Sequence, residues 1–326
     1  MENQEYFEDR IGLELLQEKV GEIKKEIAKV IIGQEQMIEL MIVALLADGH
    51  VLLEGVPGIA KTLTAKMLSK LISTNFSRIQ FTPDLMPSDV TGTTVFNAGN
   101  SKFEFNAGPI FSNIVLIDEI NRAPAKTQSA LFEVMEEKQV TVDGTTYPME
   151  APFLIFATQN PLEHEGTYRL PEAQLDRFLF KLVVDYPSVT DEFLILKNAH
   201  LRQGGKEMEG VVPVIAAEQL VGFQKVIQMV HVEDHLLTYI AVIVNKTRNH
   251  ASLYLGASPR ASINILKASK AFAAIQGRDF VIPEDIKAVM VPVLIHRIYL
   301  TPEKELEGIS EVQIISDIIN SVSIPR

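Results

Sequence analysis

The 326-residue sequence contains no cysteine, which excludes disulfide bonds and thiolate chemistry. It also contains no apolar run long enough to span a membrane, which takes about 20 residues. The first residues, Met1–Glu5, are acidic and have no apolar core, so we expect no signal peptide. Together these absences favour a cytoplasmic protein without a membrane span.

Basic residues are also scarce: 30 lysines and arginines stand against 42 aspartates and glutamates, a formal net charge of −12. A protein whose main partner is nucleic acid needs a basic face that neutralises phosphates. The charge balance therefore argues against a nucleic-acid partner, although a local basic patch, for instance inside a ring pore, stays open. The length and the 47% hydrophobic content allow two domains with a substantial core.

A glycine-rich segment lies between the short apolar run 51–53 and a helix-forming run at 63–68. This order of strand, glycine-rich turn and helix N-terminus is what a phosphate-binding loop requires. Small residues let successive backbone N–H groups face one anion, and the helix N-terminus adds further donors and the positive end of its dipole. The nucleotide-binding residues predicted here are Gly55, Val56, Pro57, Gly58, Ile59, Ala60, Lys61, Thr62 and Leu63.

Lys61 and Thr62 carry the chemistry of this loop. We expect Lys61 to reach the β- and γ-phosphates of ATP and the Thr62 hydroxyl to ligate Mg²⁺. Ala60 stands where the usual pattern G-x-x-x-x-G-K-[ST] has its second glycine. Because alanine avoids positive φ, we expect Ala60 to lie already in the helix, with Gly55 and Gly58 making the turn.

Just upstream, a helical stripe over residues 11–30 ends at Ile31–Gln34, and a second apolar helix is predicted over about 36–48. Ile32 and Gly33 could cover one face of an adenine ring. A helix C-terminus with Gly33 after it explains the same residues equally well.

Two apolar strands are each followed by polar residues that can act on a nucleotide. The run 114–117 predicts a strand buried on both faces, and Asp118 and Glu119 follow at its carboxyl end, where open α/β sheets bind ligands. We expect Asp118 to hold Mg²⁺ through its water shell and Glu119 to polarise the water that attacks the γ-phosphate. A second strand at 153–158 runs into Asn160, which we expect to orient the same water.

Two arginines could add positive charge. Arg177 is either one partner of a surface ion pair with Asp176 or Glu172, or an arginine finger for a neighbouring subunit's nucleotide. Ser258 and Pro259 fit the start of a helix, from which Arg260 could reach back to the nucleotide.

We predict an αβ nucleotide-binding domain over residues 1–187 and a helical domain over 188–326. Two predicted β-hairpins, near 93–105 and 139–147, interrupt the first domain as surface insertions, the second with Asp143-Gly144 at its turn.

Taken in order, these segments resemble those of the AAA+ ATPases and specifically of the MoxR family. MoxR-type loops also have alanine at the position of Ala60. The two hairpins resemble the insertions of the helix-2-insert group, to which magnesium-chelatase subunits and MCM helicases also belong. The matching segments are Gly55–Thr62 as Walker A, Ile114–Glu119 with Asn121–Pro124 as Walker B and its extension, Ala157–Pro161 as sensor 1, Gly166–Phe178 as the arginine-finger segment and Gly256–Arg260 as sensor 2.

The resemblance implies a P-loop NTPase fold, with a parallel sheet covered by helices on both faces, followed by a small all-helical lid domain. It implies that ATP and Mg²⁺ bind between subunits of a homo-oligomeric ring, commonly a hexamer, with Arg177 supplied by the next subunit. Whether Arg169 or Arg122 shares that finger role stays open. It further implies remodelling or assembly of a partner protein, often one with a von Willebrand factor A domain, and in some cases insertion of a metal cofactor.

Two other functions stay open at this point. A nucleotide-regulated binding module would hydrolyse little ATP, and the presence of Glu119 and Asn160 argues against it. An MCM-like nucleic-acid motor would be stimulated by single-stranded DNA, and the acidic charge balance argues against it.

Overall fold

The computed structural model describes residues 2–99, 101–161, 167–202 and 207–324, and for residues 2–11 and 202 it describes the backbone alone. Its strands are β1 (Val51–Glu54), β2 (Phe76–Gln80), β3 (Gly92–Asn97), β4 (Lys102–Ala107), β5 (Ile114–Asp118), β6 (Gln139–Val142), β7 (Thr145–Pro148), β8 (Leu154–Gln159), β9 (Phe180–Val183), β10 (Leu253–Leu255) and β11 (Tyr299–Leu300). Its α-helices are α1 (Glu2–Ala28), α2 (Glu35–Leu46), α3 (Lys61–Leu71), α4 (Pro87–Thr91), α5 (Ala125–Glu137), α6 (Glu172–Leu175), α7 (Val189–Arg202), α8 (Ala217–Gln228), α9 (Asp234–Arg248), α10 (Pro259–Ile275), α11 (Pro283–Leu294), α12 (Pro302–Leu306) and α13 (Glu311–Asn320), and a 3₁₀ turn covers Ile120–Arg122.

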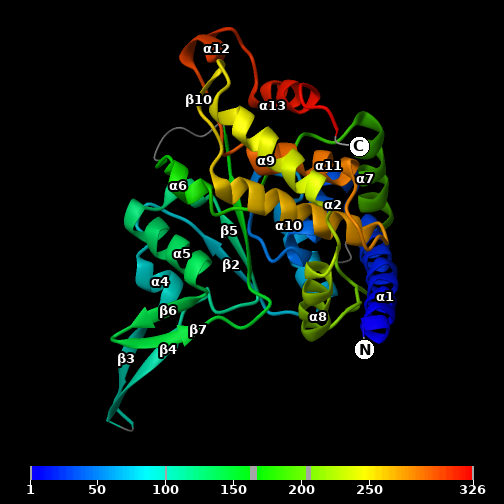
Figure 1. Cartoon of the computed structure of the whole chain (residues 1–326). Coiled ribbons are helices and arrows are strands. Elements are labelled where there is room, and N and C mark those ends of the chain that lie inside the picture. Colours follow the sequence, from blue (N-terminus) through cyan, green and yellow to red (C-terminus); the bar gives the residue numbers. More distant parts are fainter. Residues whose placement is uncertain (1, 100, 162–166, 203–206, 325–326) are drawn as a thin grey trace.

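A five-stranded parallel sheet forms the centre of the first part of the chain (Figure 1), in the order β2-β5-β8-β1-β9. The inner strands β1, β5 and β8 are buried almost throughout, which explains their continuous apolar runs. All five strands point the same way, so their carboxyl ends meet at one edge. In register, Gln80 lies beside Asp118, and Glu54 lies beside Gln159.

Successive residues of each inner strand face two separate cores, because strand side chains alternate between the two faces of a sheet. On β5, Ile114 and Leu116 join the core that contains α1, α2 and α3, whereas Val115 and Ile117 join the core that contains α4 and α5. Helices therefore cover both faces of the sheet, as predicted.

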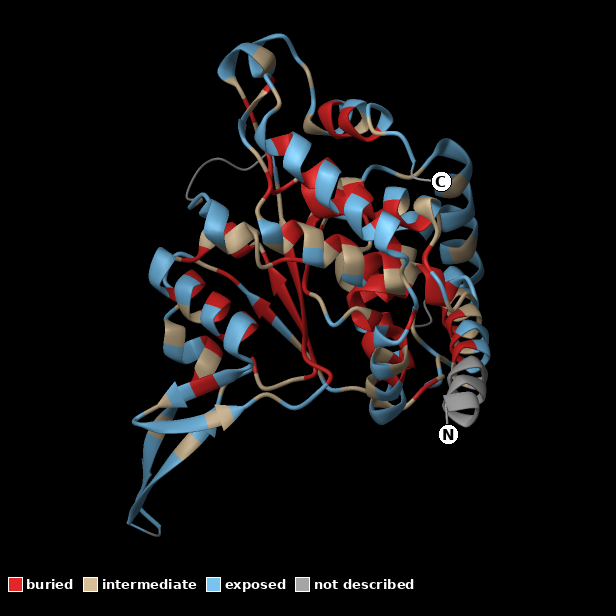
Figure 2. Cartoon of the chain, in the orientation of Figure 1, coloured by how far each residue is buried: buried red, intermediate tan, exposed pale blue. Residues whose placement is uncertain are grey.

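The chain after residue 188 is mainly helical, and its helices α8 to α11 and α13 share the first of these cores with α1 and α2. The predicted lid is thus helical, with one addition: β10 and β11 pair as a short antiparallel sheet. Sequence reasoning missed these strands because they contain three and two residues. Figure 2 shows buried residues concentrated in the central strands and on the inner faces of the surrounding helices.

Both predicted hairpins are present and extend away from the rest of the chain at the lower left of Figure 1. The Asp143-Gly144 turn has positive φ at both residues, as a two-residue hairpin turn requires. The first hairpin's predicted turn includes Asn100, which lies outside the described residues. The rings of Phe105 and Tyr147 stack with centroids 4.1 Å apart and tie the two hairpins together. In the part of the chain that the structure describes, no helix is both long and apolar enough to cross a membrane.

Candidate functional site

A cavity of about 530 Å³ opens at the carboxyl ends of β1, β5 and β8, beside the start of α3. Most of the predicted nucleotide- and metal-binding residues line it: Ile32, Gly55, Pro57, Gly58, Ala60, Lys61, Thr62, Leu63, Asp118, Glu119 and Asn160. The remaining lining residues were not predicted: Val30, Ile31, Arg78, Gln80, Thr158, Ile195 and Glu207.

The prediction that Ala60 lies in the helix is wrong. Helix α3 begins at Lys61, and Ala60 precedes it as the N-cap in the left-handed region, with φ 63° and ψ 13°. That conformation costs roughly 1–2 kcal/mol for a residue with a Cβ. Its carbonyl accepts hydrogen bonds at 2.9 Å from both the backbone N–H and the hydroxyl of Thr64, which help to hold it there. The loop thus keeps its left-handed turn without the second glycine.

Gly55 and Gly58 are glycines for different reasons. A Cβ on Gly55 would lie 2.6 Å from the Val184 carbonyl oxygen and 2.8 Å from the Ile59 side chain, so close packing excludes it. Gly58 has open space around it but a φ of 88°, which favours glycine. The loop therefore combines a tight approach to the end of β9 with backbone exposed to the cavity.

Lys61 is half-buried, and its amino group donates a hydrogen bond to the Gly55 carbonyl across the loop. Burial lowers the pKa of Lys61, while the carboxylates of Asp118, Glu54 and Glu119 act in the opposite direction. A half-buried cation at the start of a helix, where the first N–H groups have no partner within the helix, suits a phosphate ligand.

Asp118 and Glu119 are held by different partners. The Thr158 hydroxyl donates to the Asp118 carboxylate at 3.2 Å and accepts the Glu119 N–H at 3.0 Å. Arg78 pairs with Asp118 at 2.6 Å, from its Nε to Oδ2. The Glu119 carboxylate accepts from the Gln80 amide at 2.8 Å, and the Arg122 Nε lies 3.1 Å from it.

Arg78 and Gln80 lie on β2, and they reach the two carboxylates because β2 pairs with β5, a pairing that the sequence does not reveal. Glu119 itself has φ 57° and ψ 53°, a left-handed conformation of the kind that clusters at functional sites.

The carboxylate of Asp118 and the hydroxyl of Thr62 are hard oxygen ligands in one cavity, a donor set that fits Mg²⁺.

The apolar end of the cavity is formed by Ile31 and Ile32 after α1 and by Ile195 on α7. These side chains suit a flat apolar ring such as adenine. Gly33, predicted with Ile32, does not line the cavity: it follows the helix at φ 75° and lies against Asp191. Helix α1 ends at Ala28, five residues before Gly33, so Gly33 is not the C-cap of that helix either. Val56 and Ile59 are also absent from the lining, and Ile59 is buried in the core.

The two predicted arginines lie outside this cavity and share one carboxylate, that of Glu136 on α5. Arg260 Nη2 lies 2.6 Å from Glu136 Oε1, and Arg177 Nε lies 3.6 Å from Glu136 Oε2. Arg177 also donates to the Phe132 carbonyl. The ion pair predicted for Arg177 thus has a different partner from those expected. Gly166, the first residue of the predicted finger segment, lies outside the described residues.

Arg260 does not line this cavity, and its guanidinium pairs with Glu136 on α5. The start of α10 lies beside α6, where the Ser258 hydroxyl donates to the Asp176 carboxylate at 2.9 Å. A role of Arg260 toward a nucleotide stays a prediction.

Comparison with known proteins places this site in a family. The model of the "ATPase family associated with various cellular activities (AAA)" matches residues 50–180, and that of the "AAA lid domain" matches residues 245–318. The chain is 49% identical over 306 residues to the YeaC protein of Bacillus subtilis, covering 94% of this chain and 95% of that protein. It is 44% identical over 315 residues to Chaperone MoxR1 of Mycobacterium tuberculosis, covering 92% of this chain and 81% of that protein. The chain belongs to the MoxR family of AAA+ ATPases.

A solved structure agrees with this assignment. The MoxR-family chain described here matches a crystal structure of a candidate ATPase from Cytophaga hutchinsonii with a TM-score of 0.91 and 42% identity, covering 100% of both chains. The two matched family ranges contain the Lys61 loop, Asp118 and Arg177 in the first and Arg260 in the second. The predicted AAA+ fold, a parallel sheet followed by a helical lid, is thereby confirmed.

Proposed function

We propose that this MoxR-family protein binds and hydrolyses ATP between the subunits of a homo-oligomeric ring and uses the energy to remodel or assemble a partner protein. One observation carries the proposal. Lys61, Thr62, Asp118 and Glu119 line one cavity, whereas Arg177 does not line it and pairs with Glu136 instead.

Within one subunit, the loop N–H groups and Lys61 would bind the β- and γ-phosphates, and Ile32 and Ile195 would contact the base. Mg²⁺ held through Thr62 and Asp118 would supply positive charge to the phosphate oxygens. Glu119 would accept the proton of the attacking water, which Asn160 orients.

The remaining cations would come from the next subunit. Phosphoryl transfer needs charge stabilisation around the γ-phosphate, and an arginine supplied from outside can do this. Arg177 and Arg260 do not line their own cavity, whereas Arg122 already contacts its own Glu119. We therefore assign the finger role to Arg177, with Arg260 beside it.

The finer parts of the proposal rest on the family. They are a hexameric ring, a cytoplasmic location, the division into domains at residues 187/188 and a protein client, including proteins with a von Willebrand factor A domain. The relative named Chaperone MoxR1 supports a chaperone-like role. Help with metal-cofactor insertion is a further option for the client reaction.

The test is complementation between two inactive variants. Lys61→Ala should lose nucleotide binding, and Arg177→Ala should keep binding but lose about 1,000-fold in turnover. When the two variants are co-expressed, an Arg177→Ala subunit beside a Lys61→Ala subunit has an intact cavity and an intact neighbouring arginine. Phosphate release should therefore reappear.

Absence of activity at every ratio of the two variants would contradict an arginine supplied by a neighbour. Stimulation of turnover by single-stranded DNA would instead favour an MCM-like motor.

A further inference from the structure

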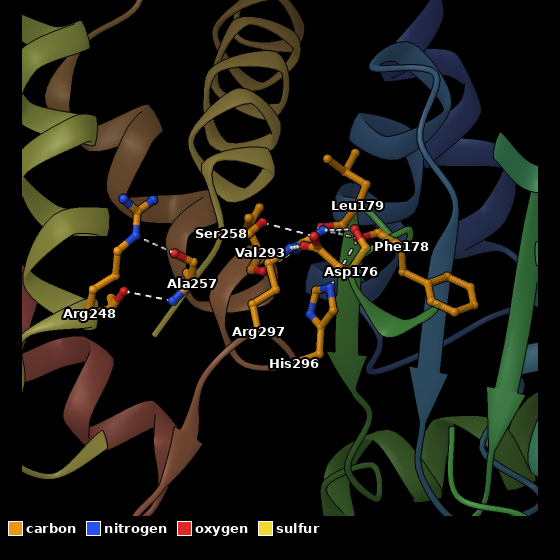
Figure 3. Close-up of polar contacts among 10 residues, drawn as sticks. Asp176, Phe178, Leu179, Arg248, Ala257, Ser258, Val293, His296 and Arg297 are labelled. Carbon is orange, nitrogen blue, oxygen red and sulfur yellow. Dashed lines mark hydrogen bonds and ion pairs between the residues drawn. The ribbon is translucent and has the colours of Figure 1, made fainter. Parts of the chain in front are cut away.

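Arg297 lies just after α11 and is a buried cation (Figure 3). Its hydrogen-bond partners lie on the arginine-finger segment, directly after it, or at the end of α11. Its Nε donates to Asp176 Oδ1 at 2.6 Å, and its Nη2 donates to the Asp176 carbonyl at 2.8 Å. It also donates to the Phe178 and Leu179 carbonyls and to the carbonyl of Val293 near the end of α11. The chain immediately around Arg177 is thus fixed to the lid.

The other oxygen of the same carboxylate binds a second lid residue. The Ser258 hydroxyl donates to Asp176 Oδ2 at 2.9 Å, and Ser258 is the N-cap of α10, two residues before Arg260. We call Asp176, Ser258 and Arg297 the Asp176 latch. Each oxygen of the Asp176 side chain therefore contacts a different part of the lid.

The turn that carries Ser258 is itself held to α9. Arg248 Nε donates to the Ala257 carbonyl at 2.8 Å, and the Ala257 N–H donates to the Thr247 hydroxyl at 2.9 Å. A Cβ on Gly256 would lie 2.5 Å from the Arg248 Cα, so α9 and this turn are in direct contact. The start of α10 is therefore a fixed part of the lid, and the Asp176 latch connects it to the finger.

A second link joins the two arginines themselves, since both contact Glu136. Glu136 contacts both side chains, and the Asp176 latch joins the chain next to Arg177 to the chain next to Arg260, so the two arginines are held in one arrangement relative to each other.

Stability alone does not explain the charge of Arg297. Burial lowers the pKa of Arg297 to about 10, with Asp176 acting in the opposite direction. Apolar residues of similar volume often replace a buried ion pair with no loss of stability. What an apolar residue could not do is bind a carboxylate and several carbonyls in a fixed geometry.

We propose that Asp176 and Arg297 are positioning residues for Arg177 and Arg260, so that lid and finger present both arginines to the neighbouring subunit as one unit. The inference rests on the proposed function. Movement of the lid in one subunit would then move both arginines at the next subunit's γ-phosphate.

The decisive variant is Asp176→Asn, which keeps the side-chain size and removes the charge that Arg297 binds. Displacement of a catalytic group by about 1 Å can cost on the order of 100-fold. We expect kcat to fall about 10- to 100-fold, with the KM for ATP changed less than about twofold because the subunit's own cavity is untouched. Co-expression with Lys61→Ala, which supplies an intact latch and both arginines, should restore turnover.

Two further variants separate positioning from folding. Ser258→Ala removes one hydrogen bond of the latch and should lower kcat less than Asp176→Asn does. Co-expression with Lys61→Ala should restore turnover in this case too. Asp285→Asn is the matched control, because it breaks another buried lid ion pair, Arg278–Asp285 at 2.6 Å, that does not contact Asp176. Asp285→Asn should lower the melting temperature. Co-expression with Lys61→Ala should not raise its kcat.

The Arg177→Ala and Lys61→Ala mixture is the reference for these experiments. If the reference regains activity and the Asp176→Asn mixture does not, or if Asp176→Asn alone has normal kcat, the positioning role is overturned while the proposed function stands. If the reference itself fails, the proposed function and this inference fall together.

Discussion

At the scale of single residues, the two carboxylates after β5 have different surroundings. Asp118 is buried and contacts Arg78 and the Thr158 hydroxyl, whereas Glu119 is half-buried and accepts from Gln80. A buried carboxylate with fixed partners suits a metal ligand, and a more accessible one suits a proton acceptor. The two neighbours can thus have separate roles in one reaction.

Replacing Glu119 by glutamine tests its role as general base. Glu119→Gln keeps the size of the side chain and should still bind ATP, while turnover falls about 100-fold or more because no group accepts the proton of the attacking water. Binding of a fluorescent nucleotide and release of phosphate measure the two effects separately. Glu133→Gln, at an exposed position on α5, is the matched control. Normal turnover of Glu119→Gln would rule out this role.

At the scale of elements, His50 joins the beginning of β1 to β8 and α5. Its Nδ1 accepts the Ile155 N–H at 3.0 Å, and its Nε2 lies 3.2 Å from the Met135 carbonyl, to which it donates. Protonation of Nδ1 would place two N–H groups against each other. Burial is the main cause that lowers the pKa of His50, from its ordinary 6.5 to about 4.

This histidine makes the packing of α5 on the sheet sensitive to acid. Because the folded-state pKa lies below the unfolded one, the unfolded chain binds more protons between about pH 4 and 6.5, and stability falls as the pH falls through that window. Full protonation of His50 lowers the free energy of unfolding by about 3 kcal/mol. Buried His296, whose pKa is also lowered well below its ordinary value, acts in the same direction.

Urea unfolding at pH 7 and pH 4.5 measures this effect. His50→Gln should be less stable than the parent at pH 7 but lose less stability on acidification, because the shifted group is gone. His200→Gln, at an exposed position on α7, should keep the parent's pH dependence. If His50→Gln and the parent lose equal stability on acidification, His50 is not the group that makes the protein sensitive to acid.

At the scale of the whole molecule, the nucleotide cavity and the arginine pair are separate, because neither arginine lines the cavity and both contact Glu136. In the proposed ring, the arginine pair of one copy would complete the cavity of the next copy. This requires head-to-tail contacts between copies, which close into a ring if the rotation allows.

Turnover per subunit should accordingly depend on protein concentration. We expect it to rise as the protein is concentrated and to fall on dilution, in step with the assembly state measured by light scattering. ATP binding by the Lys61 loop should change little over the same range. A turnover per subunit that stays constant down to concentrations where only monomers scatter light would contradict the proposal.

The sequence by itself determined the elements and the residues at their ends. Lys61, Thr62, Asp118, Glu119 and Asn160 could be found because each follows or begins a strongly patterned strand or helix. Parallel strands bring their carboxyl ends to one edge, so local pattern was sufficient to collect these side chains around one cavity.

Only the tertiary structure decided what depends on contacts between distant segments. The position of Gln80 beside Glu119 and the pairing of Arg260 with Glu136 both fall in this class. The latch between Asp176 and Arg297 joins residues 121 positions apart. Hydrophobic periodicity specifies which face of an element is buried, but strand order and lid docking are set by the packing of the whole core.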